Sequence, residues 1–493
     1  MFMYRHLLFT CLLLLSFACN AQKVNITLLQ LNDVYEMSPL NAGKTGGLAR
    51  VASLQKQLKS KNKHTFGVLA GDLLSPSAIG TSKIDGERLA GKQMIAVFNH
   101  LHWDYATFGN HEFDVGKPAL LKRLEETKTV FFSSNVLDSA THQPFANSQG
   151  TVTFTVDGVK IGLVGITIPH TPVDFVTFLD PLAAAGKAIQ ELKRQQADVI
   201  VLVTHQDLSS DIEFAEKLDG VDLIIGGHEH ENAYLVRGAK LVPVTKADAN
   251  AKSAFVHNIT VDKQAGTKHI ASKLVFLDES VALDVDTTAV VDQWQQQAFT
   301  AFKQQGFDPD KIICHTQEAL DGLEASVRNK KTALTNLIAQ AFLHAYKSAE
   351  LSLYNSGAIR IDDVLPPGAL TEYDVIKIMP FGDSISLVQM SGELLEKALN
   401  AGLGNKGKGG FLQYANVSNA NKQWLVNDQA IDPKRDYKVA INNYLIEKGD
   451  TGLEFLAEKD NTALTRLNEP QFDARKVFIQ ELTANNCATS LPK

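Results

Sequence analysis

Residues 109–114 read Gly109-Asn110-His111-Glu112-Phe113-Asp114, and the rest of the chain can be interpreted from this motif. It follows residues 105–108, a short run of bulky residues that is typical of a buried strand and is ended by Gly109. An amide, an imidazole and carboxylates therefore sit on one turn at the end of a strand. We predict that this turn opens onto a pocket, with Asn110 as a metal ligand and His111 as a catalytic acid. A single loop carries such residues by chance often enough that other strand ends must decide.

Four other apolar runs also end in residues that bind metals. They cover residues 25–31, 66–70, 199–203 and 221–225, and they are followed by Asp33, Asp72, His205, and the pair His228 and His230. Helical patterns such as residues 181–196 separate the runs. This order predicts a layered α/β architecture with polar residues at the carboxyl ends of the strands.

These ligand types belong together chemically. Carboxylates, one amide oxygen and three imidazoles suit a pair of borderline divalent cations such as Zn²⁺, Mn²⁺ or Fe²⁺. A shared carboxylate bridges two ions that are about 3.5–4 Å apart, an arrangement suited to phosphoryl chemistry. The sequence therefore predicts a site for two divalent metal ions.

Length and charge limit the organisation and the partners. The 493 residues are too many for one core and indicate two domains. The net charge of −7 comes without a long basic run, so neither a nucleic acid polymer nor an anionic membrane surface is expected as a partner. A polar, Gln-rich stretch with periodic Val, Trp and Phe over residues 283–307 predicts an amphipathic connecting helix. The oligomeric state is left open.

The N-terminus has the pattern of an export signal. Basic residues precede the apolar residues 7–17, which are too few to span a bilayer but suit the core of a signal peptide. Cleavage before Cys19 would give a lipid-anchored lipoprotein, and cleavage after Ala21 would give a free protein. We expect an exported protein, periplasmic or membrane-anchored. Beyond the leader and its candidate lipid-anchor residue, Cys314 and Cys487 are the remaining cysteines and could pair in an oxidising compartment.

Taken in order, the motifs resemble those of the calcineurin-like metallophosphoesterases, and in detail those of the exported 5'-nucleotidase / UDP-sugar hydrolase family. The matching segments are GGLARVA at 46–52, AGD at 70–72, GNHEFD at 109–114 and GGHEH at 226–230. The resemblance implies a four-layer α/β/β/α sandwich with a second, smaller α/β C-terminal substrate domain. It divides the chain into a signal peptide (1–21), a metallophosphoesterase domain (22–280), a connecting helix (281–311) and a 5'-nucleotidase C-terminal substrate-binding domain (312–485).

The resemblance also implies a role for each site residue. One metal would take Asp33, Asp72 and His230, and the other Asp72, Asn110, His205 and His228, so that Asp72 is the bridge. His111 would be the catalytic imidazole, kept charged and aimed by Asp114. In the family's mechanism a metal-bound hydroxide attacks phosphorus in line, and the metals and the imidazole offset charge on the phosphoryl and leaving oxygens.

One residue departs from the family pattern. The family has Asp-x-His at the first strand, and here the sequence is Asp33-Val34-Tyr35. A phenol must lose a proton, with a reference pKa near 10, before it binds a metal strongly. Three interpretations are open: a weaker first site completed by water, a site that prefers a harder metal, or a degenerate site.

The second half of the chain resembles the family's substrate domain. Arg328 and Arg360 match phosphate-contacting arginines, which donate bidentately to phosphate oxygens. Asn355 and Asp450 match contacts to the base and ribose, and Phe381 and Tyr444 match two rings that sandwich the base. The resemblance implies hydrolysis of 5'-nucleotides. A 2',3'-cyclic nucleotide or nucleotide-sugar hydrolase, or an inactive binding relative, is the alternative.

Overall fold

Two six-stranded sheets face each other in the N-terminal half of the computed structural model, which describes residues 23–169, 173–457 and 461–488. The predicted signal peptide (residues 1–21) and the candidate lipid anchor Cys19 lie outside these residues. The first sheet has the order β16 (Thr267–Phe276), β15 (Ser253–Asp262), β1 (Val24–Leu31), β2 (Thr65–Leu69), β5 (Tyr105–Ala106) and β6 (Val130–Phe131). The second has the order β13 (Ala233–Arg237), β14 (Val242–Lys246), β12 (Leu223–Gly227), β11 (Val199–His205), β9 (Val159–Thr167) and β8 (Thr151–Val156).

Alternating side chains build the layers. Along β11, Val199, Val201 and Val203 point into the core between the two sheets. Ile200 and Leu202 point the other way, into the core under the helices. Because strand side chains alternate with period two, each sheet buries both of its faces, one against the other sheet and one against helices.

Helices cover the outer face of each sheet. The first sheet packs against α1 (Leu48–Lys61), α2 (Lys92–Leu101) and α6 (Val285–Gln304). The second packs against α4 (Pro181–Arg194) and α5 (Leu208–Lys217). A further helix, α3 (Lys117–Glu126), follows the GNHEFD turn. The N-terminal domain is therefore the four-layer α/β/β/α sandwich that was predicted.

The C-terminal domain has its own sheet and cores. Its strands run in the order β23 (Leu412–Ala415), β19 (Leu351–Asn355), β27 (Asp436–Asn442), β22 (Ser384–Ser391) and β28 (Leu464–Arg466), and β29 (Phe472–Asp473) also pairs with β22. Smaller pairings join β17 (Ile312–Thr316) to β21 (Gly368–Thr371), and β24 (Val417–Ala420) to β25 (Gln423–Val426) and β26 (Gln429–Ala430). The helices are α7 (Glu324–Val327), α8 (Ala333–Ala345), α9 (Glu372–Ile378), α10 (Gly392–Gly404), α11 (Asn443–Glu447) and α12 (Ala474–Asn485).

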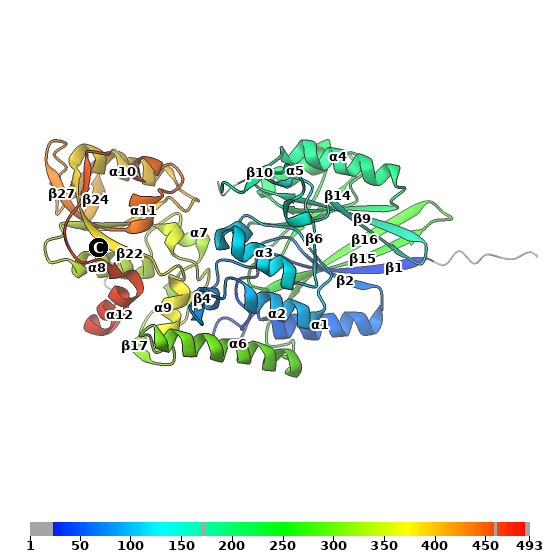
Figure 1. Ribbon diagram of the computed structural model, residues 1–493, viewed down its shortest axis with the longest axis horizontal. Helices are drawn as coiled ribbons and strands as arrows, with labels where there is room; N and C mark the ends of the chain where they lie inside the picture. The colour runs from blue at the N-terminus through cyan, green and yellow to red at the C-terminus, as the bar shows by residue number, and fades with distance from the viewer. Residues whose placement is uncertain (1–22, 170–172, 458–460, 489–493) are drawn as a thin grey trace, which may run out of the picture.

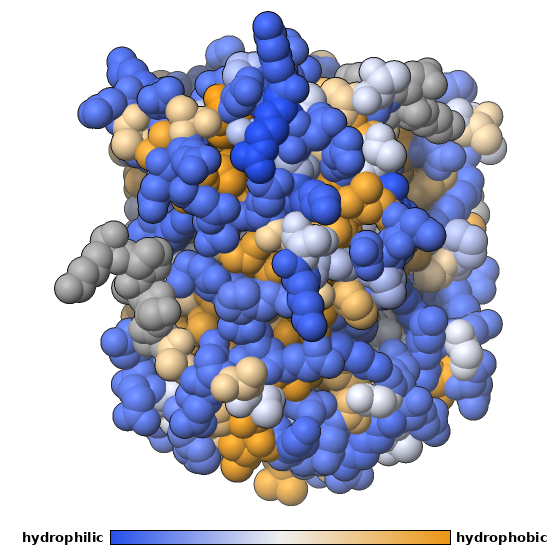
Figure 2. All heavy atoms as spheres, turned by 90° about the vertical axis from the view of Figure 1, so that its left-hand side faces the viewer, coloured by the Kyte–Doolittle hydropathy of each residue, from blue (hydrophilic) through white to orange (hydrophobic). Residues whose placement is uncertain are grey.

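The two domains lie side by side, and α6 runs along one edge of the molecule toward β17, where the C-terminal domain begins (Figure 1). A disulfide joins Cys314 on β17 to Cys487 just after α12, so the end of the described chain is tied to the start of this domain. The end of the C-terminal domain that faces away from its neighbour is mostly hydrophilic, with apolar side chains in small scattered groups (Figure 2). Within the described ranges, no helix combines the length and apolar character that crossing a bilayer requires.

Candidate active site

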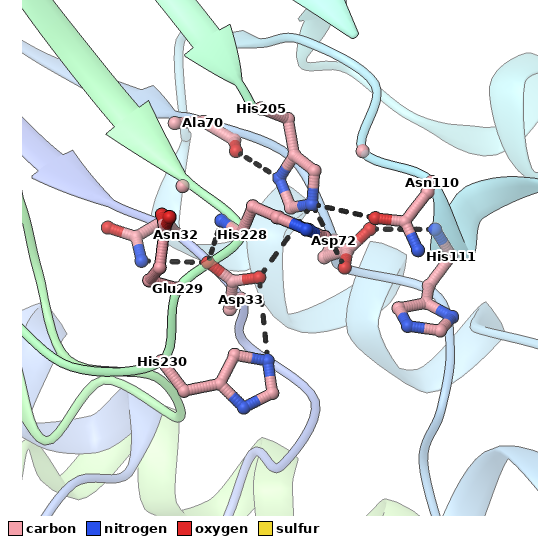
Figure 3. A network of polar contacts seen from close by, with 12 residues as sticks. Asn32, Asp33, Ala70, Asp72, Asn110, His111, His205, His228, Glu229 and His230 are labelled. Carbon is pink, nitrogen blue, oxygen red and sulfur yellow. Dashed lines mark hydrogen bonds and ion pairs between the residues drawn. The ribbon is translucent and has the colours of Figure 1, made fainter. Parts of the chain in front are cut away.

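The predicted metal ligands meet at one edge of the two N-terminal sheets. Each follows or ends one of five strands, which are β1, β2, β5, β11 and β12. Asp33, Asp72, Asn110, His205 and His230 come from both sheets and lie around a common centre, and His111 lies beside them (Figure 3). The parallel strands direct their carboxyl ends to the same edge, so residues far apart in sequence become neighbours there.

Asp33 and Asp72 occupy unusual backbone positions at two of these strand ends. Their φ angles are 53° and 60°, in the left-handed region that aspartate tolerates better than most residues. The two loops hold each other: the amide of Asp33 donates to Gly71 O at 3.0 Å, and the amide of Val34 donates to Asp72 O at 2.8 Å. The carboxylates are thus fixed relative to each other by the backbone.

Glu112 of the GNHEFD turn organises the same region. Its buried carboxylate accepts hydrogen bonds from the amides of Asp72, Leu73, Leu74 and Gly109. Burial raises the pKa of Glu112 to about 7, and the charge of Asp72 adds to the rise. Gly109 is required beside it, because a Cβ there would lie 2.1 Å from Asp72 Oδ1. Glu112 had no role in the sequence interpretation, although it stands inside the motif.

The ligand atoms form two overlapping groups around Asp72. Its Oδ2 atom lies 3.3 Å from His205 Nε2 and 2.8 Å from the hydroxyl of Tyr35. His205 Nε2 is also 3.0 Å from Asn110 Oδ1. One donor atom from each of Asp33, Asp72 and His205 lies within 4.8 Å of the others, and all three residues are buried. Buried carboxylates and imidazoles this close suit divalent metal ions, so the residues fit the cofactor that the sequence predicts.

Charges around the site act on one another strongly. Burial by itself would lower the pKa of His205, but the carboxylates of Asp72 and Asp33 outweigh it and raise the pKa to about 10. His230 behaves in the same way: burial opposes the charged ring, while Glu324 and Asp362 raise its pKa to about 9. Anionic groups therefore surround both imidazoles, which is the environment a bound cation needs.

The other two predicted ligands lie beside these groups. The backbone amide of His228 donates to Asp33 Oδ2 at 3.0 Å, and the His228 ring lies 5.2 Å from that of His205, in an edge-on arrangement. His230 points Nε2 toward Asp33 Oδ1 at 3.8 Å. All six residues predicted to bind metal thus lie in one cluster.

His111 and Asp114 form a close pair at the rim of the cluster. His111 Nδ1 lies 2.6 Å from Asp114 Oδ2, and the backbone amide of His111 donates to Asp72 Oδ1 at 2.8 Å. Because a carboxylate only accepts, Nδ1 carries the proton and donates. Nε2 then faces Arg360 Nη1 of the C-terminal domain at 3.4 Å. The imidazole is oriented by one domain and contacted by the other.

The predicted substrate residues of the C-terminal domain are grouped near this contact. The Arg360 guanidinium lies 5.5 Å from the centre of the Phe381 ring, and Asn355 Nδ2 donates to Asp450 Oδ2 at 2.6 Å. Arg328 forms an ion pair with Glu324, and burial lowers the pKa of its guanidinium. The amide of Tyr444, at the start of α11, donates to Asp383 Oδ2 at 3.0 Å, which joins this helix to the segment that carries Phe381.

Two contacts that hold the site together could not be predicted from the sequence. The ammonium of Lys246 is fully buried and donates to Gln206 O and Gly227 O at 2.5 and 2.6 Å, so it ties together the ends of β11 and β12 next to His205 and His228. Asp362 Oδ2 lies 2.9 Å from His230 Nδ1. A lone lysine and a lone aspartate have no motif spacing, so only the folded structure brings them to the site.

Comparisons with known proteins agree with this fold. Residues 26–232 match the calcineurin-like phosphoesterase family, and residues 312–458 match the 5'-nucleotidase C-terminal domain. The chain is 27% identical over 469 residues to an NAD 5'-nucleotidase of Haemophilus influenzae, covering 80% of this chain and 76% of that protein. It is 25% identical over 479 residues to a 5'-nucleotidase of Vibrio cholerae, covering 86% and 85%.

A solved structure supports the architecture. The 5'-nucleotidase precursor from Thermus thermophilus superposes with a TM-score of 0.79 at 22% identity, covering 94% of this chain and 97% of that one. The fold and the ligand cluster define a hydrolase of the metallophosphoesterase class. More particularly, the chain belongs to the family in which a calcineurin-like phosphoesterase domain is joined to a 5'-nucleotidase C-terminal domain.

Proposed function

We propose that the protein is an exported, metal-dependent phosphohydrolase that releases phosphate from 5'-nucleotides. The observation that carries this proposal is the contact between Arg360 and His111. It brings a phosphate-binding side chain of the C-terminal domain to the imidazole beside the metal ligands. The names of the relatives, which are 5'-nucleotidases, support the choice of substrate.

The side chains of the site have different roles in this proposal. Arg360 and Arg328 bind the phosphate oxygens, since guanidinium groups donate bidentately to them. Two divalent ions, such as Zn²⁺ or Mn²⁺, would supply an activated water and neutralise negative charge on the phosphate when bound. Asp33, Asp72 and His230 would hold one ion, and Asp72, Asn110, His205 and His228 the other.

His111 acts on the leaving group in this proposal. Its Nδ1 donates a hydrogen bond to Asp114 Oδ2 at 2.6 Å, so Nε2 is the nitrogen that faces the substrate side. With substrate between the ring and Arg360, a proton held at Nε2 would stabilise the growing charge on the leaving oxygen. Arg360 lies at the same nitrogen, so the phosphate that it binds would be within reach of the ring.

The C-terminal domain would recognise the nucleoside. Phe381 and Tyr444 stack on the base, and Asn355 and Asp450 contact the base and ribose. In this proposal the substrate-binding domain covers residues 312–485. A signal peptide at residues 1–21 directs export, so that the protein is periplasmic or is attached to the membrane by a lipid anchor at Cys19. The disulfide between Cys314 and Cys487 supports export, since disulfides persist in oxidising compartments.

A substrate panel with the metals varied tests the proposal. The purified protein is stripped with a chelator, reloaded with Mn²⁺, Zn²⁺ or Co²⁺, and offered 5'-nucleotides, 2',3'-cyclic nucleotides, nucleotide sugars and p-nitrophenyl phosphate. We expect 5'-nucleotides to have the highest kcat/KM, and activity to disappear on chelation and return with metal. A preference for cyclic nucleotides or nucleotide sugars would replace the substrate assignment. Metal binding without hydrolysis of any substrate would indicate an inactive relative.

A further inference from the structure

The hydroxyl of Tyr35 lies among the ligand atoms of the first metal position. It is 3.1 Å from Asp33 Oδ1, 2.8 Å from Asp72 Oδ2 and 3.2 Å from His230 Nε2. The tyrosine side chain is buried, with a relative exposure of 3%. Its oxygen is therefore held in the site by its surroundings, in contact with every residue expected to bind this ion.

The distances describe one face of a coordination shell. Tyr35 Oη, Asp33 Oδ1 and His230 Nε2 form a triangle with sides of 3.1, 3.2 and 3.8 Å. The point equidistant from these three atoms lies about 2.0 Å from each, close to the 2.0–2.2 Å of metal–oxygen and metal–nitrogen bonds. A single cation can therefore contact all three atoms with little movement of the side chains.

The same triangle argues against a phenol that fills the place of the ion. If the hydroxyl oxygen sat at the centre of a tetrahedral set of ligands, Asp33 Oδ1 and His230 Nε2 would lie about 5 Å apart. They are 3.8 Å apart. The phenol oxygen lies at a corner of the shell, beside the other ligands.

We propose that Tyr35 is a metal ligand through its phenolate oxygen, and that the first site takes a hard cation. Binding breaks the phenol O–H bond, forms the oxygen–metal bond and releases the proton to solvent. The first site then has oxygen ligands from Tyr35, Asp33 and Asp72 and a single imidazole. Oxygen ligands of this kind favour hard cations.

The neighbouring metal site has a different set of ligands from the first site. It would share Asp72 and add Asn110, His205 and His228, so it offers two imidazoles and no phenolate. Nitrogen-rich sites favour borderline ions such as Zn²⁺. We therefore expect the two positions to prefer different cations. This inference rests on the metal-dependent hydrolysis proposed above.

Ferric iron is the probe for the phenolate, because iron(III) bound to a phenolate absorbs visible light by charge transfer. The full-length mature protein is stripped of metal and titrated with ferric iron in the presence of one equivalent of Zn²⁺. We expect a visible band that saturates at one iron per chain, with tyrosinate vibrations enhanced in resonance Raman spectra. Nucleotide hydrolysis is measured on the same samples.

Three variants assign the band. Tyr35→Phe should lose it and bind iron more weakly by more than about 100-fold, since loss of an outer contact alone costs about 10–100-fold. Tyr35→His should lose the band but keep two metals, with the first site now preferring Zn²⁺ over ferric iron. The control is Tyr437→Phe, which removes another buried hydroxyl, one that accepts from the Asp432 amide at 2.9 Å in the C-terminal domain. It should keep the band.

Three results would overturn the inference: wild-type protein that binds no ferric iron or binds it without a band, a band that survives in Tyr35→Phe, or tighter metal binding in Tyr35→Phe. The last would mean that the phenol competes with the ion. Hydrolysis of nucleotides without a band would reject the phenolate ligand and leave the proposed function standing. A band without hydrolysis of any phosphoester would reject the function and leave the ligand standing.

Discussion

Asp362 of the C-terminal domain accepts a hydrogen bond from His230 of the N-terminal domain, with Oδ2 2.9 Å from Nδ1. The other nitrogen of the ring, Nε2, consequently faces the candidate ligand cluster, 3.8 Å from Asp33 Oδ1. Asp362 Oδ1 accepts from the amide of Glu324, and Lys252 Nζ donates to the backbone oxygen of Asp362. A metal-ligand candidate of one domain is thus oriented by the other.

This contact predicts that Asp362 is a positioning residue for the first metal. Asp362→Asn should weaken metal binding at that site by about 10–100-fold, the usual cost of losing the outer partner of a ligating histidine. Titration of the stripped protein against a competing metal indicator measures the change. Turnover at saturating metal should recover more than turnover at limiting metal.

A neighbouring aspartate provides the control. Asp363 accepts from the amide of Val364 through its side chain and has no hydrogen bond to His230 within the described residues. Asp363→Asn should leave metal affinity unchanged. If Asp362→Asn binds metal as wild type does, the contact only packs the domains together.

The strand ends that carry the candidate metal ligands could be located from the sequence because an apolar run marks most of the length of each strand. The apolar run at 25–31 corresponds to β1 (Val24–Leu31), and the run at 199–203 lies within β11 (Val199–His205). The strand β11 continues through Thr204 and His205 because their backbones still pair with Ile166 and Thr167 of β9. Backbone pairing does not depend on polarity, so a hydrophobic pattern ends before the strand does.

Glycine caused the largest shift in a predicted strand. The sequence places a strand at 221–225, whereas β12 spans Leu223–Gly227. Glycines usually weaken a strand, so the pattern ends before them. Here Gly227 is required by close packing, because a Cβ would lie 2.4 Å from Ala70 O. The predicted strand at 105–108 is likewise shorter, since β5 ends at Ala106 and Phe108 packs against Phe113 and Phe131.

Contacts between the domains could not be predicted. His230 and Asp362 are 132 residues apart and belong to separate cores. No periodic pattern links them, and neither does a short motif. The same holds for Lys246, whose role depends on where β14 places it beneath two other strand ends.

Asp72 is expected to contact both metal ions, so we predict that changing it lowers metal content more than changing any other candidate ligand. Asp72 Oδ2 borders both groups of ligand atoms. Asp72→Asn should therefore lower the content of both metals, whereas Asn110→Ala should affect mainly one. Metal analysis after gel filtration measures this difference. Asp286→Asn, on the exposed side of α6, is the control. Normal turnover in Asp72→Asn would exclude the bridging role.

His111 is predicted to act in catalysis without holding the metals. His111→Ala should reduce kcat by about 10²–10⁴, the usual contribution of a positioned acid or base, with metal content unchanged. Asp114→Asn should cost less, because it acts through the ring. His100→Ala, at the exposed end of α2, should have no effect. Loss of metal from His111→Ala would make His111 a ligand.

The aromatic pair gives the most direct test of nucleotide recognition. Asp383 accepts from the amide of Tyr444, so the start of α11 is held to the segment that carries Phe381. A base stacked on either ring should gain about 1–3 kcal/mol, so each change to Ala should raise KM for nucleotides about 5–150-fold. Hydrolysis of p-nitrophenyl phosphate, which has no base, should change much less.

Further variants distinguish the loss of stacking on the base from other effects on substrate binding. Phe381 also lies under the Arg360 guanidinium at 5.5 Å, so Phe381→Ala can disturb phosphate binding as well, and Tyr444→Ala is the cleaner variant. Arg360→Ala should weaken binding of all phosphoesters alike. Phe472→Ala removes a partly exposed ring that packs on Tyr346 elsewhere in the domain and should leave KM unchanged. Unchanged KM values for nucleotides in folded, metal-loaded Tyr444→Ala and Phe381→Ala would favour a phosphoester without a base.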